Sequence, residues 1–67
     1  MKLLDKFNIT DKMELRLQIG DFEGKERVDI RQYLKRDNEY IPLKKGINFD
    51  SEWVDRFITM VEKLKDI

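Results

Sequence analysis

The sequence contains no cysteine and no histidine among its 67 residues. These two absences exclude disulfide bonds, thiolate chemistry, imidazole acid–base catalysis and the ordinary zinc sites. Ser51 is the only serine, and no histidine is available to activate it as a nucleophile. Asp21 and Glu23 are only a weak magnesium signal, and no glycine-rich phosphate loop is present. We therefore expect no catalytic residue, no metal site and no cofactor, and the chain is not predicted to be an enzyme.

The short length limits the chain to one domain, residues 1–67. A domain of about 60 residues buries only about 60% of the surface that its unfolded chain exposes, so its core is marginal. Small domains usually compensate with disulfides, a metal or association of subunits. Since the sequence supplies neither cysteine nor histidine, we expect a homodimer.

Charge of one sign does not dominate the composition, because 14 basic residues balance 14 acidic ones. A net charge of zero argues against tight, non-specific binding to a nucleic-acid duplex. The N-terminal stretch MKLLDKFNI has only two leucines before Asp5, far short of a signal-peptide core or a membrane span. The sequence predicts a soluble, intracellular protein with no membrane association.

Alternating apolar and polar side chains indicate β-strands in the first three quarters of the chain. Residues 13–19 alternate strictly, which is the pattern of a half-buried strand. Residues 25–34 alternate in the same way after the glycine-bounded turn GDFEG. Two further short strands are predicted over residues 39–44 and 46–49. Pro42 has no backbone N–H to donate, so it belongs at a sheet edge or a break.

One helix is predicted over residues 51–66, with Asp50 as its N-cap. Its apolar residues recur every three or four positions and form a wide stripe. The expected fold class is α+β, a curved four-stranded antiparallel sheet followed by one C-terminal α-helix (ββββα), as a homodimer. The residues expected in the dimer interface are Trp53, Phe57, Ile58 and Val61.

The second face of this sheet carries basic side chains. In the predicted alternation Arg16, Lys25, Arg27, Arg31 and Tyr33 point away from the core, and Phe22 lies in the adjoining turn. Single-stranded nucleic acids bind to basic grooves that also offer aromatic rings for base stacking. Alternatively, Phe22 folds back over the core edge and Tyr33 is an ordinary strand residue, as is Tyr40.

The stretch DFEGKERVDIRQYL, followed by PLKKGINF and a helix opening DSEW, resembles the DNA-binding domain of positive cofactor 4, a single-stranded-DNA-binding transcriptional coactivator. That family carries a D-F-x-G-K turn, an I-D-I-R-E-Y-W strand, a P-G-R-K-G-I-S-L segment and a helix starting N-P-E-Q-W. The resemblance runs from about Phe7 to the C-terminus. It implies a homodimer whose curved sheets form channels for single-stranded DNA.

The resemblance also implies roles for individual residues. Phe22 would stack on bases, and Lys25, Arg31 and Lys45 would contact phosphates. Leu34 stands where the family has a base-stacking tryptophan, so this chain lacks that ring. The complete set expected to bind nucleic acid is Arg16, Phe22, Lys25, Arg27, Arg31, Tyr33, Leu34, Lys44 and Lys45.

The predicted function is sequence-tolerant binding of single-stranded DNA, with RNA as the alternative ligand, in transcription, replication or repair. Transcription or replication proteins are the candidate protein partners. The resemblance favours a compact bacterial or phage-type protein, which would be cytoplasmic and nucleoid-associated; a eukaryotic one would be nuclear. A protein–protein interaction module of the same fold with little nucleic-acid affinity is the second hypothesis, and the neutral charge and Leu34 favour it.

Overall fold

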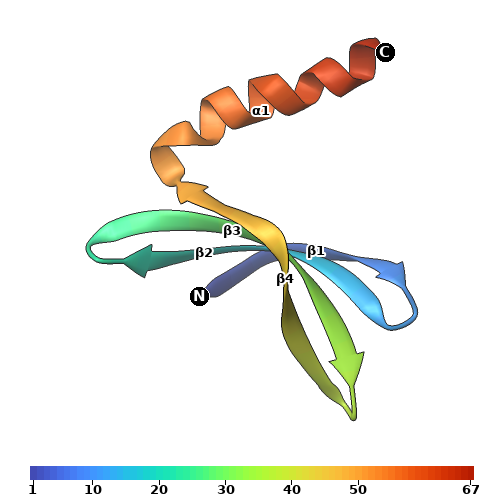
Figure 1. Ribbon diagram of the computed structural model, residues 1–67. Coiled ribbons are helices and arrows are strands. Elements are labelled where there is room, and N and C mark those ends of the chain that lie inside the picture. Colours follow the sequence, from blue (N-terminus) through green and yellow to red (C-terminus); the bar gives the residue numbers. More distant parts are fainter.

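The computed structural model describes residues 1–67 as a four-stranded antiparallel sheet followed by one C-terminal helical segment (Figure 1). The strands follow the sheet in chain order, so each is hydrogen-bonded to its neighbour in sequence. This confirms the predicted sheet and helix. The strands are β1 (Lys2–Thr10), β2 (Met13–Phe22), β3 (Lys25–Arg36) and β4 (Glu39–Asp50).

Two of the four predicted strands were assigned incorrectly. Residues 2–10 form the edge strand β1, which the sequence analysis did not predict, and the segments 39–44 and 46–49 belong to one strand, β4. Register shifts interrupt the pairing of β1 with β2 at two places and that of β3 with β4 at one place. Bulges of this kind break the period of two by which strands are identified in a sequence. Pro42 lies in β4, at the sheet edge, as expected.

Two-residue turns fix the register on both sides of β3. Glu23 and Gly24 have φ of 51° and 79°, and Asp37 and Asn38 have φ of 51° and 68°. Two successive positive φ angles are the geometry of a type I′ turn, whose twist matches that of paired strands. The pairing of β2 with β3 runs without a shift along both strands. The side chains of these two strands are therefore sorted strictly between the two faces.

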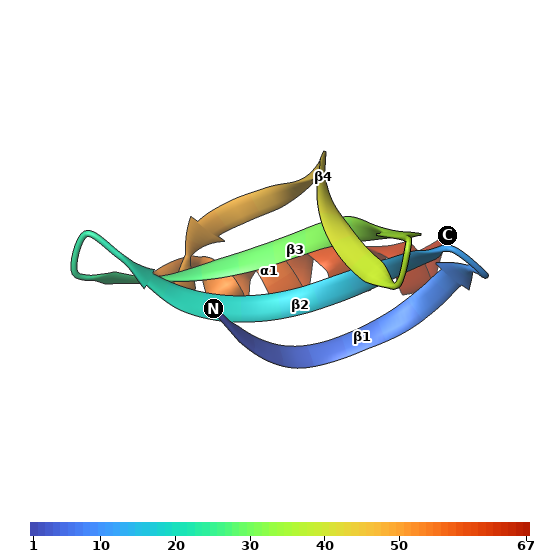
Figure 2. The ribbon, with the colours of Figure 1, turned by 90° about the horizontal axis from the view of Figure 1, so that it is seen from below.

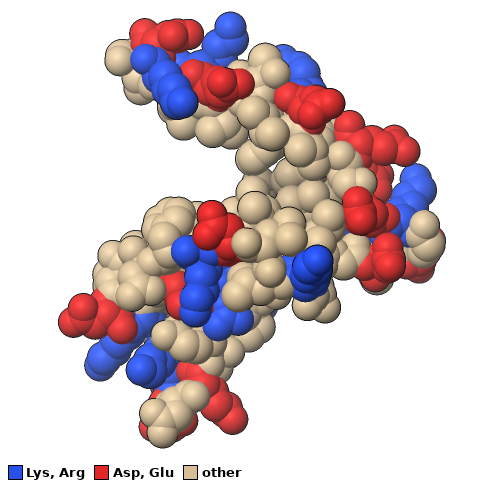
Figure 3. Space-filling view, turned by 180° about the vertical axis from the view of Figure 1, so that it is seen from behind, with Lys and Arg blue, Asp and Glu red and all other residues tan.

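The C-terminal segment is helical from Ser51 to Asp66, with 3₁₀ turns (Ser51–Trp53 and Lys63–Asp66) on either side of helix α1 (Val54–Glu62). Asp50 precedes it, but its side chain makes no capping hydrogen bond. No residue of α1 is buried. In a single chain the helix does not cover the sheet: Figure 1 shows it standing off the sheet, and the space-filling view of Figure 3 shows a cleft between them. No helix of the chain is long and apolar enough to cross a membrane.

Apolar side chains line this cleft from both sides. Val28 and Phe49 are the only buried apolar residues of the chain. Phe49 packs against the start of the helix, with its ring centroid 4.9 Å from that of Phe57 and 6.3 Å from that of Trp53. The hollow beside them has a volume of about 310 Å³ and is wholly apolar. We call these residues the apolar face: Leu4, Leu17, Ile19, Val28, Ile30 and Phe49 on the sheet, and Val54, Phe57 and Ile58 on the helix.

Candidate nucleic-acid interface

The other face of the sheet carries charged and polar side chains from all four strands. In the register Arg16 lies opposite Arg31, and Gly20 lies opposite Arg27. Phe22 and Lys25 form the last pair, beside the β2–β3 turn. We call this surface the polar face, and its members are Lys6, Glu14, Arg16, Gln18, Gly20, Phe22, Lys25, Arg27, Asp29, Arg31, Tyr33 and Asn48.

The polar face is less basic than the sequence suggested, because carboxylates lie beneath its arginines. Glu14 and Asp29 are among the five buried residues of the chain, with 1% and 3% of their surface exposed. Burial of a carboxylate is unfavourable unless the charge is paired and hydrogen-bonded. Both acids meet this condition, and no buried side-chain nitrogen or oxygen lacks a hydrogen-bond partner.

Glu14 is paired with two cations of the polar face. Arg16 donates from Nε to Glu14 Oε1 at 2.5 Å, and Lys6 Nζ lies 3.5 Å from Oε2. Burial by itself raises the pKa of Glu14, but the hydrogen bonds and charges of Arg16 and Lys6 together outweigh it and hold this pKa below its ordinary value. Glu14 is therefore a carboxylate at neutral pH, and it fixes the position of Arg16.

Arg31 is held in the same way by Asp29 and by the bulge in β4. Its Nη2 donates to Asp29 Oδ1 at 3.0 Å, and its Nη1 donates to the Leu43 carbonyl at 2.8 Å. The hydrogen bond to Asp29 raises the pKa of Arg31. Gly46 makes this close approach of β4 possible, since a Cβ there would lie 2.7 Å from the Ile30 carbonyl oxygen. A guanidinium has five N–H donors, so Arg31 still has donors for a phosphate.

Phe22 stands beside a hollow at the end of the polar face. Its side chain lies at the tip of β2, and 65% of the residue is exposed. The hollow has a volume of about 390 Å³, and its lining includes Gly20, Arg27 and Asn48. Gly20 faces the hollow without a side chain of its own, and Arg27 is oriented by a 2.8 Å hydrogen bond from its Nε to Asn48 Oδ1. An exposed ring, an adjacent hollow and a cation can together receive a stacked base.

The three lysines of the predicted nucleic-acid-binding set remain free. Lys25 lies at the start of β3, and Lys44 and Lys45 lie in the bulged part of β4; all three are exposed. None of them forms an ion pair, whereas Lys6, Arg16, Arg27 and Arg31 each do. The three lysines are therefore the cations most available to a phosphate backbone.

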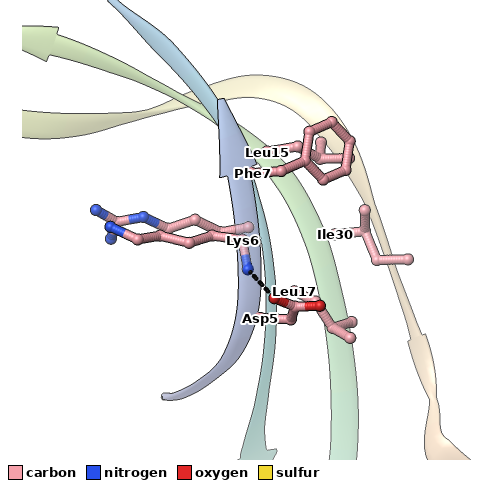
Figure 4. A pocket seen from close by; sticks show the side chains of 7 residues that line it. Asp5, Lys6, Phe7, Leu15, Leu17 and Ile30 are labelled. Carbon is pink, nitrogen blue, oxygen red and sulfur yellow. Dashed lines mark hydrogen bonds between the residues drawn. The ribbon is translucent and has the colours of Figure 1, made fainter. Parts of the chain in front are cut away.

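Leu34 does not lie on the polar face, contrary to its inclusion in the predicted site. It pairs with Met13 on β2 and with Ile41 on β4. Successive side chains of a strand point to opposite faces, so Leu34 shares the side of Ile30 rather than that of Arg31. Figure 4 shows the same separation of the two faces, since Ile30 of β3 and Lys6 of β1 point to opposite sides of the sheet.

Two further residues join the site that were not in the predicted set. The Lys6 side chain reaches the polar face from β1, and the Tyr40 ring reaches it from β4: the Arg16 guanidinium carbon lies 4.9 Å from the Tyr40 ring centroid, and Lys6 Nζ lies 5.7 Å from it. Arg16 also lies 4.3 Å from the centroid of Tyr33, whose hydroxyl accepts a 2.5 Å hydrogen bond from Gln18 Nε2. Lys6 was not predicted because the strand that carries it was not predicted. Tyr40 was not predicted because only the bend of β4 brings it close to Arg16.

Comparison with known proteins places this geometry in a family. The chain is 44% identical over 39 residues to the RNA polymerase II transcriptional coactivator KELP of Arabidopsis thaliana, covering 57% of this chain and 24% of that protein. It therefore spans about a quarter of the length of that relative. The fold is similar to that of a PC4 homologue from Burkholderia pseudomallei, with a TM-score of 0.87 at 20% identity over 96% of both chains.

A second similar structure is the bacteriophage T5 homologue of the eukaryotic transcription coactivator PC4. This phage protein is implicated in recombination-dependent DNA replication. Its TM-score is 0.72 at 22% identity, and the match covers 90% of this chain and 74% of that one. Residues 9–60 of the present chain match the family described as Transcriptional Coactivator p15 (PC4), which is a non-enzymatic family. The chain thus belongs to the PC4 family of transcriptional coactivators.

Proposed function

We propose that the chain binds single-stranded DNA without strong sequence preference, through the polar face of a homodimer. The observation that carries this proposal is Phe22, an aromatic ring that is 65% exposed beside a hollow. Lys25 and Arg27 flank that ring, so a base stacked on Phe22 would bring its phosphates close to positive charge. Membership of a family known for single-stranded DNA binding supports the same ligand.

The ion pairs of the polar face predict a moderate rather than a steep salt dependence. Four of its five cations already face carboxylates, which leaves Lys25 as its free charge, together with Lys44 and Lys45 in the adjoining bulge of β4. Each phosphate neutralised on a single strand contributes about −0.7 to the slope of log K against log salt, so three contacts give about −2 per protomer. Duplex DNA cannot stack its bases on Phe22, so single strands should bind more tightly.

A second copy of this chain is the proposed occupant of the apolar face. A compact monomer of this mass would expose about 4,500 Å², whereas this chain exposes 5789 Å². Its radius of gyration is 13.4 Å, against about 11 Å expected for a compact domain of this length. The surplus, about 1,250 Å², exceeds the roughly 800 Å² that each partner buries in a standard interface. Trp53, Ile58 and Val61 contribute to this surplus, being 61%, 50% and 41% exposed.

Fluorescence anisotropy with labelled oligo-dT, at several salt concentrations, tests the binding function. We expect Lys25→Ala to weaken binding and to make the salt slope shallower by about 0.7, while the matched control Lys63→Ala, on the helix, changes neither. Phe22→Ala should weaken binding by about 1–3 kcal/mol, and Phe22→Tyr should restore most of the loss. Equal or tighter binding to duplex DNA, or a flat salt response, would contradict the proposed mechanism.

Sedimentation equilibrium tests the dimer. The wild-type chain should sediment as a dimer at micromolar concentration. Ile58→Glu places a charge in the apolar face and should shift it to the monomer, because an unpaired buried charge is strongly unfavourable. Thr59→Glu, on the adjacent exposed position, is the matched control and should remain dimeric. The concentration of about 100 μM lies well above the dissociation constants of stable interfaces. A wild-type chain that stays monomeric near 8.2 kDa at this concentration would refute the dimer.

A protein–protein interaction module is the second candidate, and the ion pairs within the polar face favour it. A face whose arginines are already neutralised attracts a polyanion less than its count of basic residues suggests. Such a module would bind oligo-dT and oligo-U equally weakly and without dependence on Phe22. Preferential binding of oligo-U would instead identify RNA as the ligand. We propose transcription, replication or repair as the process served, in line with the roles of the two relatives.

A further inference from the structure

A bend in β4 places an aromatic ring at the opposite end of the polar face from Phe22. Between Gly46 and Pro42 the pairing of β3 with β4 is shifted, and Arg31 holds the bulged segment through the Leu43 carbonyl. β4 bends sharply at this point, and its first half stays paired with the end of β3 (Figure 2). Although β3 separates β4 from the first two strands of the sheet, the Tyr40 ring lies close to Arg16 of β2 and Lys6 of β1.

Fixed cations hold the Tyr40 ring in place. Arg16 is itself anchored by Glu14 and lies next to the Tyr33 ring as well. A guanidinium near an aromatic ring is attracted by the ring's quadrupole. No other aromatic ring stacks on Tyr40, and 38% of the residue is exposed. The ring is therefore oriented by charges within the polar face and still presents surface to solvent.

The spacing of the two rings suits a single strand of several nucleotides. Arg16, which contacts the Tyr40 ring, lies six residues before Phe22, which is about 20 Å along β2 at roughly 3.3 Å per residue. Arg31 and Arg27 lie between them in the register. Aromatic rings combined with cationic side chains are the means by which proteins hold single strands without reading their sequence.

We propose that Tyr40 is a second base-stacking site, which receives one nucleobase of the same strand that stacks on Phe22. This inference rests on the proposed single-stranded DNA binding. The site lies on β4 and is assembled from Lys6, Arg16 and Tyr40, so it differs in place from the position of Leu34. Tyr40 acts by direct contact with the base, and Arg16 and Lys6 act as positioning residues that orient the ring.

Titrations of Tyr40→Leu and Tyr40→Phe with a series of oligo-dT lengths test the proposal. Tyr40→Phe keeps the ring and should bind as the wild type does. For oligonucleotides long enough to span both rings, Tyr40→Leu should bind about tenfold more weakly, equivalent to about 1.4 kcal/mol and within the range for one stacked base. The salt slope should not change, because no phosphate contact is lost. For oligonucleotides too short to reach from Phe22 to Tyr40, Tyr40→Leu and the wild type should bind equally.

The length series separates base stacking from a purely structural role. If Tyr40 only held the β3–β4 hairpin in place, Tyr40→Leu would weaken short and long oligonucleotides alike, and that result would overturn the proposal. Unchanged binding of long oligonucleotides would overturn it too. In both cases a loss on Phe22→Ala would leave the proposed function intact. If the wild type bound no oligonucleotide of any length, the proposed function and this inference would fail together. Photo-crosslinking with iodouracil-substituted oligonucleotides should label Tyr40 in the wild type, and labelling at Phe22 alone would refute the site.

Discussion

Replacement of Arg31 by methionine should destabilise the fold before it affects any ligand. The variant keeps the apolar stem but removes the guanidinium that bonds to Asp29 and to the Leu43 carbonyl. Asp29 is 3% exposed and would keep only the 3.3 Å hydrogen bond from Asn48. Loss of one partner of a buried ion pair costs about 3–5 kcal/mol. Because the Arg31 side chain is 24% exposed, we expect a smaller loss, about 2–3 kcal/mol.

Urea unfolding at one fixed protomer concentration measures this loss, because the stability of the proposed dimer would depend on concentration. The matched control Lys45→Met alters an exposed lysine without an ion pair and should stay within about 0.5 kcal/mol of the wild type. Addition of Asp29→Asn to Arg31→Met should recover a large part of the stability, because the buried charge is then gone. A loss below about 0.5 kcal/mol for Arg31→Met, or a double variant less stable than the single one, would refute the reasoning.

Two further predictions concern the buried acid and the predicted stacking position. The pKa of Glu14 is lowered in the folded chain, so the stabilising contribution of Glu14 is complete above its unfolded pKa of about 4.3 and is lost as the pH falls through its folded pKa. Glu14→Gln should therefore lower the stability at neutral pH and flatten the acid limb of a plot of stability against pH. An acid limb that does not change would contradict the pairing of Glu14 with Arg16 and Lys6. Leu34→Trp should leave oligo-dT affinity unchanged, because Leu34 shares the side of Ile30 rather than that of the polar face. Tighter binding in anisotropy titrations would show that this position reaches the ligand after all.

Several features of the fold and the site could be predicted from the sequence because they depend on local patterns. The alternation over residues 13–19 and 25–34 identified the two central strands and separated Arg16 from Leu17. The apolar stripe identified the C-terminal helix, and the motif before Lys25 placed Phe22 in the turn, whereas in the structure Phe22 is the last residue of β2. The assignment of Leu34 to the binding site followed the family pattern, although strict alternation in β3 already placed it with Val28 and Ile30.

The alternation of residue types is enough to predict which residues share a face of β2 and β3, because side chains alternate with a period of two wherever the pairing is unbroken. What those residues contact depends on how the strands are arranged in the fold. The bulges in β1 and β4 are irregularities without a periodic signature, and they bring Lys6 and Tyr40 to Arg16. The burial of Glu14 and Asp29 depends on strands far apart in sequence. Pairing with these acids, rather than the number of basic residues, therefore decides how much positive charge the polar face offers a nucleic acid.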